Sequence, residues 1–279
     1  MSQPLRGWRK LAGASWRAPS DPQFFGDLEI DATRLLEHLE RVRRASGVHV
    51  TVTHAVVRAI ARALEAVPEL NVRIARGRAH PRESIDVLVI VAAAGDELTG
   101  VKVSGADRKS LVEVATDIES RVASIRADTD LEFGRTKQML ALLPKPVLRP
   151  ALRLSAWLTS DLNLHLPRLG LPQQAFGGAM VSSIGMAGIS HAYSPLAAYY
   201  RVPFLVLVGS VTDKAVVEDG QVVVRPVLGL TATFDHRYTD GLRAAALARA
   251  AREYLMDPAT FEPPPAETGV RTAAPADGR

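Results

Sequence analysis

The chain has 279 residues, with 34 Lys and Arg against 30 Asp and Glu, 47% hydrophobic residues and no cysteine. The lack of cysteine excludes a disulfide-stapled scaffold, a Cys-ligated zinc or iron–sulfur site and a cysteine nucleophile. The formal net charge of +4 is small for this length, and the arginine clusters at 41–44 and 73–82 are not interleaved with aromatic residues. We therefore expect solvated helix faces and turns, not a nucleic-acid surface.

The sequence carries no signal for a membrane span or for secretion. Residues 1–10 lack the apolar core of a signal peptide, and no uncharged apolar run reaches the roughly 18 residues that a spanning helix needs. We expect a cytoplasmic protein.

The first part of the chain predicts a strand followed by two amphipathic helices. Residues 24–30 predict the strand, and Asp31 is placed to cap a helix that ends at Gly47. Thr53 is expected to cap the second helix, which ends before Pro68. The apolar stripes that define these helices are Leu35, Leu36, Leu39 and Val42 in the first, and Val56, Val57, Ile60, Leu64 and Val67 in the second.

The next part alternates short strands with a third helix. Residues 71–76 predict a strand, and 76–82 (RGRAHPR) a turn. The continuous apolar run at 87–94 predicts a central strand that is buried on both faces. The third helix is marked by the stripe Leu111, Val114, Ile118, Val122 and Ile125.

Residues 134–172 are the least regular part of the chain. Pro144, Pro146 and Pro150 interrupt the first half, and 147–162 is apolar on most sides but includes two arginines. Two interpretations are open. The segment is either a docking surface for a partner, another subunit or a membrane surface, or a helix packed over the domain.

The last third is rich in strands. Apolar runs at 179–184 and 204–211 predict two of them, Asp219-Gly220 predicts a hairpin turn, and residues 231–234 alternate as in a half-buried strand. A final helix is marked by Leu242, Ala246, Leu247 and Ala250. We expect one domain over 1–260, of α/β or α+β class with a mixed sheet, and a disordered tail rich in Pro and Ala over 261–279.

The seven histidines do not suggest a metal site, since no pair has the His-x-x-x-His spacing that brings two imidazoles to one helix face. His54 lies near the start of the second helix, where packing alone explains it. His236 differs, because it lies between a strand and a helix with Asp235 and Asp240 nearby. It is either a general base held by an aspartate or a histidine in a capped turn.

Residues 233–241 read TFDHRYTDG, which resembles the Asp-His-Arg-x-x-Asp-Gly signature of the dihydrolipoamide acyltransferases. These are the catalytic cores of 2-oxo acid dehydrogenase complexes and share the fold of chloramphenicol acetyltransferase. Four other segments resemble the family in the same order, over roughly residues 8–258. They are 53–71 with its Pro-x-x-Asn end, 106–111, the 181–185 strand (VSSIG, for Ile-Ser-Asn-Leu-Gly) and the Asp219-Gly220 hairpin.

The resemblance implies a chloramphenicol acetyltransferase-like mixed-sheet sandwich with packed helices, and acyl transfer between coenzyme A and a second thiol without a metal. His236 would be the general base, Ser182 would stabilise the oxyanion, and Asp240 would hold the histidine loop through an arginine such as Arg9 or Arg17. Ser183 replaces the usual Asn of the family, which leaves open which hydroxyl is used. The family implies a homotrimer, or an assembly of trimers, in which His and Ser come from different subunits.

Compared with the usual member, we expect a bare catalytic core without a lipoyl or subunit-binding domain, and the segment at 134–172 is longer than the family core requires. Lys214, within Asp213-Lys214-Ala215, has a lipoylation-like context, but we expect it in a surface turn of the core and reject it as a lipoyl site. The lipoyl group would then be carried by another chain, and the expected partners are a lipoyl-bearing protein or dehydrogenase subunits. Two alternatives remain: a small-molecule O- or N-acetyltransferase of the same fold, and a non-catalytic scaffold that retains the core.

Overall fold

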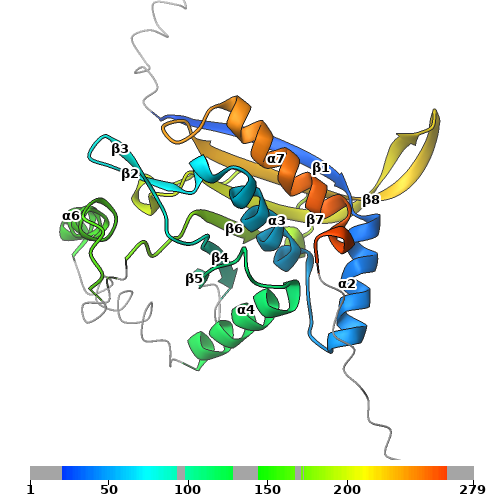
Figure 1. The fold of residues 1–279 in the computed structure, drawn as a ribbon, viewed down its shortest axis with the longest axis horizontal. Helices are drawn as coiled ribbons and strands as arrows, with labels where there is room; N and C mark the ends of the chain where they lie inside the picture. Colours follow the sequence, from blue (N-terminus) through cyan, green and yellow to red (C-terminus); the bar gives the residue numbers. More distant parts are fainter. Residues whose placement is uncertain (1–20, 93–97, 128–143, 167–170, 172, 263–279) are drawn as a thin grey trace, which may run out of the picture.

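The computed structural model describes residues 21–92, 98–127, 144–166, 171 and 173–262. Its centre is a six-stranded mixed sheet in the order β1-β8-β7-β6-β4-β5 (Figure 1). β4, β6 and β7 are parallel to one another, and the other neighbours are antiparallel. The strands are β1 (Gln23–Asp31), β4 (Val87–Ala92), β5 (Leu98–Val103), β6 (Ala179–Ser183), β7 (Phe204–Glu218) and β8 (Gln221–Asp235).

Four helices share one hydrophobic core with one face of this sheet. They are α2 (Thr33–Ser46), α3 (Val52–Ala66), α4 (Leu111–Arg126) and α7 (Gly241–Met256). The core joins the predicted stripes of α2, α3 and α4 to strand residues such as Val89, Val181, Val206 and Leu230. The periodicity of the sequence therefore identified the helix faces that are buried.

Two helix starts differ in detail from the predicted ones. Asp31 accepts the backbone N–H of Thr33 (2.8 Å), but the N-cap position of α2 is Ala32. α3 is capped by Thr51, not by Thr53. Thr51 has an extended backbone and accepts the N–H of His54, whose Nδ1 accepts the N–H of Thr51 in return (3.2 Å). His54 thus completes a reciprocal cap of the kind usually made by Glu or Gln.

The short basic stretch at 76–82 is not only a turn. Arg76 and Gly77 have positive φ values of 52° and 72° and join β2 (Val72–Ala75) to β3 (Arg78–Pro81). The two strands form a small antiparallel sheet of their own. The predicted strand at 87–94 is confirmed as β4, an interior strand between β6 and β5 whose Val89 and Leu88 are buried on opposite faces; residues 93 and 94 lie outside the described part of the chain.

The predicted hairpin at Asp219-Gly220 is confirmed, with φ values of 50° and 78°. Its strands are longer than expected, since β7 and β8 have 15 residues each and extend beyond the rest of the sheet (Figure 1). Lys214 is inside β7, paired with Arg225 and in an ion pair with Glu29, so its predicted position in a turn is wrong.

The other face of the sheet is covered by the segment that follows β6. A Cβ atom at Gly209 would lie 2.0 Å from the Ser190 carbonyl oxygen, and one at Gly229 would lie 2.5 Å from it. Further along β8, Thr233 Oγ1 donates to the Ser194 carbonyl (2.7 Å). Glycine at 209 and 229 is therefore what allows this segment to cross the sheet in contact with its backbone.

A buried ionic cluster forms around Glu262, which follows the C-terminal helix α7. Glu262 accepts hydrogen bonds from Arg58 Nε (2.9 Å), the Tyr254 hydroxyl (2.6 Å) and the backbone N–H of Leu111 (3.1 Å). Burial raises the pKa of Tyr254. Phe261 and Glu262 belong to the folded body, so the predicted tail starts too early; residues 263–279 lie outside the described part. The predicted stripe of α7 is also wrong at Leu242, which is 80% exposed.

The segment that was predicted to be irregular contains α6 (Lys145–Ala156), which continues into a π-helical turn over Trp157–Asp161. Pro146 is in the first turn of α6, where its missing N–H costs little. The part of the segment at 134–143 lies outside the described residues. In the described part of the chain, no helix has the length and apolar character needed to cross a bilayer.

Removing one partner of the buried cluster should destabilise the fold strongly. Glu262→Ala leaves the Arg58 guanidinium buried without its carboxylate, and we expect a loss of about 3–5 kcal/mol in the free energy of unfolding, measured by urea denaturation. Glu253→Ala, at an exposed position of α7, is the matched control and should change it little. Equal effects of the two substitutions would contradict a structural role for Glu262.

The reciprocal cap of α3 should make stability depend on pH. Burial, with smaller contributions from His49 and Arg43, lowers the pKa of His54 from 6.5 to about 4. The unfolded chain therefore binds a proton that the folded chain does not, and stability falls between about pH 6.5 and 4, by as much as ~3 kcal/mol. His54→Gln keeps an acceptor for the cap but does not titrate, so urea denaturation at several pH values should show a shallower loss. An unchanged slope would refute this role.

Candidate active site

His236 is placed by the end of β8 and by the chain that enters β1. Its backbone N–H donates to the Pro22 carbonyl (2.8 Å), which attaches the loop to the segment before β1. The side chain is exposed, and its ring lies 5.1 Å from the Phe24 ring between centroids. Among the described residues, neither aspartate of the motif is hydrogen-bonded to the imidazole. His236 is therefore close to both aspartates in sequence, but neither carboxylate binds its imidazole as the prediction required.

Asp235 instead holds Arg237. The Asp235 carboxylate is buried and accepts hydrogen bonds from the backbone N–H and the Nε of Arg237, both at 2.9 Å. This hydrogen bonding raises the pKa of Arg237. Tyr238, next in the loop, is half-buried and hydrogen-bonded to the backbone of Ile74, and its burial raises its pKa. The residues around His236 are thus fixed, while His236 itself faces solvent.

Asp240 is the N-cap of α7. One carboxylate oxygen accepts the backbone N–H of Arg243 (3.0 Å), and the other accepts from Arg243 Nη1 (2.7 Å). The Arg243 N–H, more than any other contact, lowers the pKa of Asp240. Arg9 and Arg17, the arginines suggested from sequence, lie outside the described residues. Asp240 thus ties the loop that carries His236 to the start of the last helix.

Ser182 lies in β6, between Ile90 of β4 and Leu207 of β7, and is half-buried. Side chains of a strand alternate between faces. Val181 packs in the core shared with the helices, while Met180 packs in a second cluster with Leu205 and Leu207. Ser182 therefore faces away from the helices, and Ser183 is on the helix side. The two hydroxyls that the sequence left as alternatives point to different sides of the sheet.

The sheet register keeps Ser182 and His236 apart within one chain. Ser182 is level with Leu207 of β7, which is level with Thr231 of β8. His236 lies five residues further along the chain, roughly 16 Å at ~3.3 Å per residue, with β7 in between. A single chain therefore does not bring His236, the predicted base, and Ser182, the predicted oxyanion donor, to the same reacting group.

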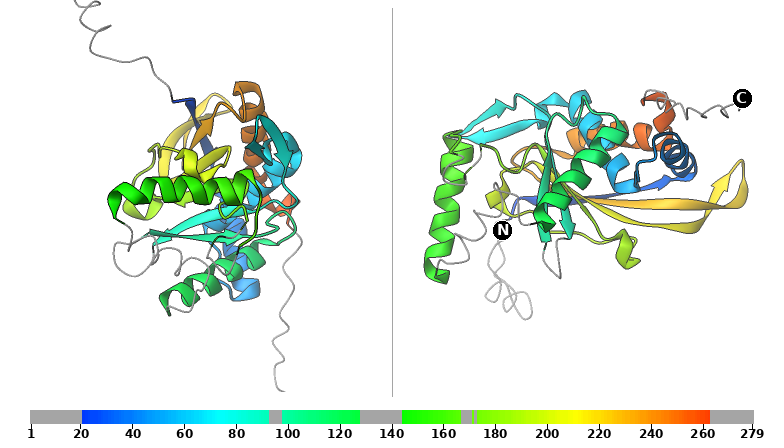
Figure 2. Two further views of the ribbon diagram at one scale, coloured as in Figure 1. Left: turned by 90° about the vertical axis from the view of Figure 1, so that its left-hand side faces the viewer. Right: turned by 90° about the horizontal axis from the view of Figure 1, so that it is seen from below.

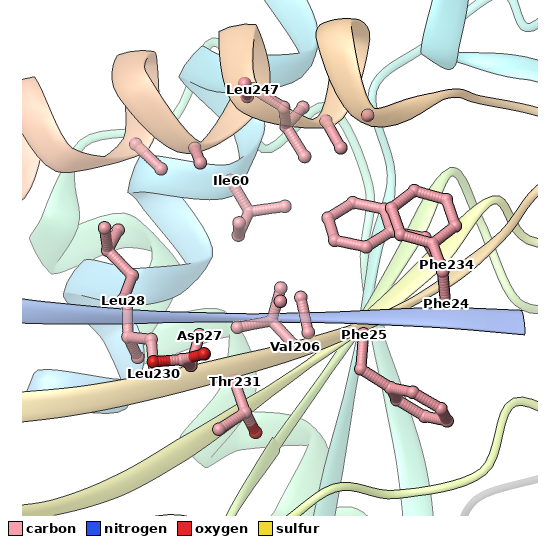
Figure 3. Close-up of a pocket in the computed structure, with 17 residues that line it drawn as sticks. Phe24, Phe25, Asp27, Leu28, Ile60, Val206, Leu230, Thr231, Phe234 and Leu247 are labelled. Carbon is pink, nitrogen blue, oxygen red and sulfur yellow. The ribbon is translucent and has the colours of Figure 1, made fainter.

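An apolar cavity of about 360 Å³ lies beside the loop, between β1 and α7 (Figure 3). Sequence reasoning did not find it. Figure 3 shows the Phe24 and Phe234 rings on the α7 side of β1, and Phe25 on the other side. The rings of Phe24 and Phe234 stack at 5.0 Å, and Phe24 also contacts His236. The space exists because small residues line it, namely Gly26, Ala244, Ala245, Ala248 and Ala251.

Within the described ranges, no three His, Asp or Glu side chains are grouped so as to hold a metal ion. The chemistry that the site offers is proton transfer by an exposed imidazole and hydrogen bonding by a half-buried hydroxyl.

Comparison with known protein families identifies the family of the chain. The family model of the 2-oxoacid dehydrogenases acyltransferase catalytic domain matches residues 2–131 and 168–262, well over half of the sequence. The chain belongs to this family. The resemblance seen in the sequence is confirmed, and the family match leaves out 132–167, nearly the segment predicted to be longer than the core requires.

Curated members of the family are similar over most of this chain. The acetyltransferase component of the pyruvate dehydrogenase complex of Bacillus subtilis (strain 168) is 26% identical over 234 residues, which are 82% of this chain and 44% of that protein. The corresponding component of the acetoin cleaving system of the same organism is 24% identical over 266 residues, 92% of this chain and 56% of that protein. The chain spans about half the length of the curated relatives it matches.

Solved structures support the predicted fold. A probable dihydrolipoamide acetyltransferase from Listeria monocytogenes 4b F2365 has a TM-score of 0.63 at 20% identity, covering 91% of this chain and 94% of that one. The cubic core of a pyruvate dehydrogenase complex has a TM-score of 0.65 at 18% identity, covering 87% and 84%. Chloramphenicol acetyltransferase has 0.51 at 14%, covering 84% and 89%. The mixed-sheet fold related to chloramphenicol acetyltransferase is confirmed.

Two substitutions at Asp240 distinguish the effect of its helix cap from the effect of its charge. Asp240→Ser keeps a good N-cap residue, whereas Asp240→Ala does not. We expect Asp240→Ala to lower the urea midpoint of unfolding and Asp240→Ser to leave it nearly unchanged, both measured by circular dichroism. Equal losses would show that the ion pair with Arg243, and not the cap, holds this junction.

Proposed function

We propose that the chain transfers an acyl group between coenzyme A and a dihydrolipoyl thiol carried by a partner protein. The observation that carries the proposal is the family motif itself, which holds the exposed imidazole of His236 on a loop whose other charged side chains are hydrogen-bonded to one another or to the backbone. His236 takes the proton of the attacking thiol. The resulting thiolate attacks the thioester carbonyl, and the imidazolium returns the proton to the departing thiolate.

Ser182 donates a hydrogen bond to the oxyanion of the tetrahedral intermediate. Because the register of one chain separates Ser182 from His236 by roughly 16 Å, we infer that each site uses His236 of one subunit and Ser182 of its neighbour. A cyclic assembly such as a homotrimer, alone or within a larger assembly of trimers, gives every subunit one such site. Asp240 is a positioning residue that holds the loop.

Both thiols come from outside the chain. The sequence has no cysteine, so transfer goes directly from one bound thioester to the second thiol, without an acyl-cysteine intermediate. Coenzyme A and its acyl form are substrates, and the lipoyl group acts in trans. The partners that this reaction requires are a lipoyl-bearing protein and the dehydrogenase subunit that acylates it.

Removing either the His236 imidazole or the Ser182 hydroxyl should abolish most of the turnover. With acetyl-CoA and free dihydrolipoamide, we expect His236→Ala to reduce kcat by about 10²–10⁴ and Ser182→Ala by about 10²–10³, measured as release of coenzyme A. Ser183→Ala, on the opposite side of the sheet, is the matched control and should retain near-normal kcat.

Mixed assemblies test the shared site. When His236→Ala and Ser182→Ala chains are co-expressed in equal amounts and purified together, a site between subunits is intact only where an unmodified His236 meets an unmodified Ser182. Random mixing makes about a quarter of the sites intact, so about a quarter of the activity should return. No recovery would show that both groups act within one chain, and the inference of a shared site would be wrong.

The choice of acceptor distinguishes the proposed reaction from its alternatives. Turnover with an alcohol or amine but with no thiol would identify a small-molecule O- or N-acetyltransferase. An assembled protein that neither binds coenzyme A in calorimetry nor turns over would identify a scaffold that has kept the fold.

A further inference from the structure

The inserted helix α6 and the turn that follows it present an apolar face that the other described residues do not cover. Val147, Pro150, Leu154 and Trp157 follow one another at spacings of three, four and three residues, which places them on one side of a helix. All four are exposed, with Val147 at 46%, Leu154 at 55% and Trp157 at 48%. Single exposed apolar residues are ordinary, but a row of four is typical of a surface that binds something.

The opposite side of α6 is attached to the body. Ala156, Thr159 and Ser160 are buried. Arg73 Nη1 donates to the Ser160 carbonyl (2.8 Å), and Arg201 forms an ion pair with Asp161 (3.0 Å). The exposed face is therefore held in a fixed orientation.

The position of α6 leaves that face accessible. Figures 1 and 2 show α6 at one end of the molecule, apart from the four helices that cover the sheet. The family match leaves out residues 132–167, so the common catalytic core does not require this helix.

The charges of the segment indicate what the face binds. Residues 144–160 contain Lys145, Arg149 and Arg153 and no Asp or Glu. Pairing of this face with a second copy of itself would bring like charges together. Cations combined with exposed Leu and Trp are the composition of helices that lie in the interface of a bilayer with anionic lipids.

We propose that α6 is a membrane-surface element that binds anionic phospholipid. The helix lies parallel to the bilayer, with Val147, Leu154 and Trp157 at the boundary between headgroups and acyl chains and with Arg153, which is exposed and next to Trp157 around the helix, at the lipid phosphates. At 12 residues, about 18 Å long, α6 rests on the bilayer and does not cross it. Binding to lipid needs no acyl transfer, so this proposal stands apart from the proposed reaction.

Vesicle flotation tests the proposal on the intact protein. Vesicles of phosphatidylcholine with phosphatidylglycerol should bind the protein, more strongly at low salt than at high salt, and vesicles of phosphatidylcholine alone should bind it much less. Leu154→Ser should weaken binding by roughly tenfold, because it removes apolar area from the bilayer. Arg153→Gln should weaken it by about fivefold, and only on the anionic vesicles.

The matched control is Leu98→Ser, the same substitution at a residue of β5 that is 70% exposed; it should bind as the unmodified protein does. Circular dichroism melting shows that each variant is folded. Failure of the unmodified protein to bind anionic vesicles, or equal binding to both vesicle types, would overturn the proposal. Absence of vesicle binding together with assemblies that Leu154→Ser reduces in size would identify a protein interface instead.

Discussion

The pairing of β7 with β6 on one side and β8 on the other is the constraint on which the functional interpretation depends. This register sets Ser182 level with Thr231 and leaves His236 five residues further on, at the sheet's end. Backbone hydrogen bonds along both ladders fix that offset, so no side-chain rotation can bring the two groups together. If both act on one carbonyl, they must come from two copies of the chain. Assembly then controls the reaction as strongly as the residues themselves do.

The histidine loop shows how a short motif can be explained residue by residue. Asp235 is buried and neutralised by Arg237, while Asp240 caps α7 and pairs with Arg243. Each aspartate pairs with an arginine two or three residues further along the chain, and the imidazole belongs to neither pair. The motif therefore specifies where His236 is held. Its charged residues fix the backbone on either side of the histidine, and the contact with Phe24 sets one side of the ring.

The sequence predicted correctly those helices and turns that are determined by residues close to one another in the chain. The stripes of α2, α3 and α4 and the Asp219-Gly220 turn depend on neighbours in sequence, and the structure confirms them. The features that the sequence did not predict depend on partners far along the chain. The sequence places Glu262 in the tail, because its neighbours give no sign of the buried ion pair that it forms with Arg58, 204 residues away. The same holds for the site: the motif identified His236, but the distance to Ser182 required the strand order, and the cavity required β1 and α7 to be placed opposite each other.

The two faces of the sheet separate the inserted helix from the groups that we propose to be catalytic. The helices and the main core occupy one face, and Ser182 points to the other, beneath the segment that crosses Gly209 and Gly229. α6 joins the body through Arg73 and Arg201, and neither residue contacts the histidine loop or β6 in the hydrogen bonds of the described chain. If α6 binds lipid as proposed, a surface added there leaves the strand register and the loop unchanged. The proposed catalytic groups and the proposed lipid-binding face therefore depend on different parts of the fold.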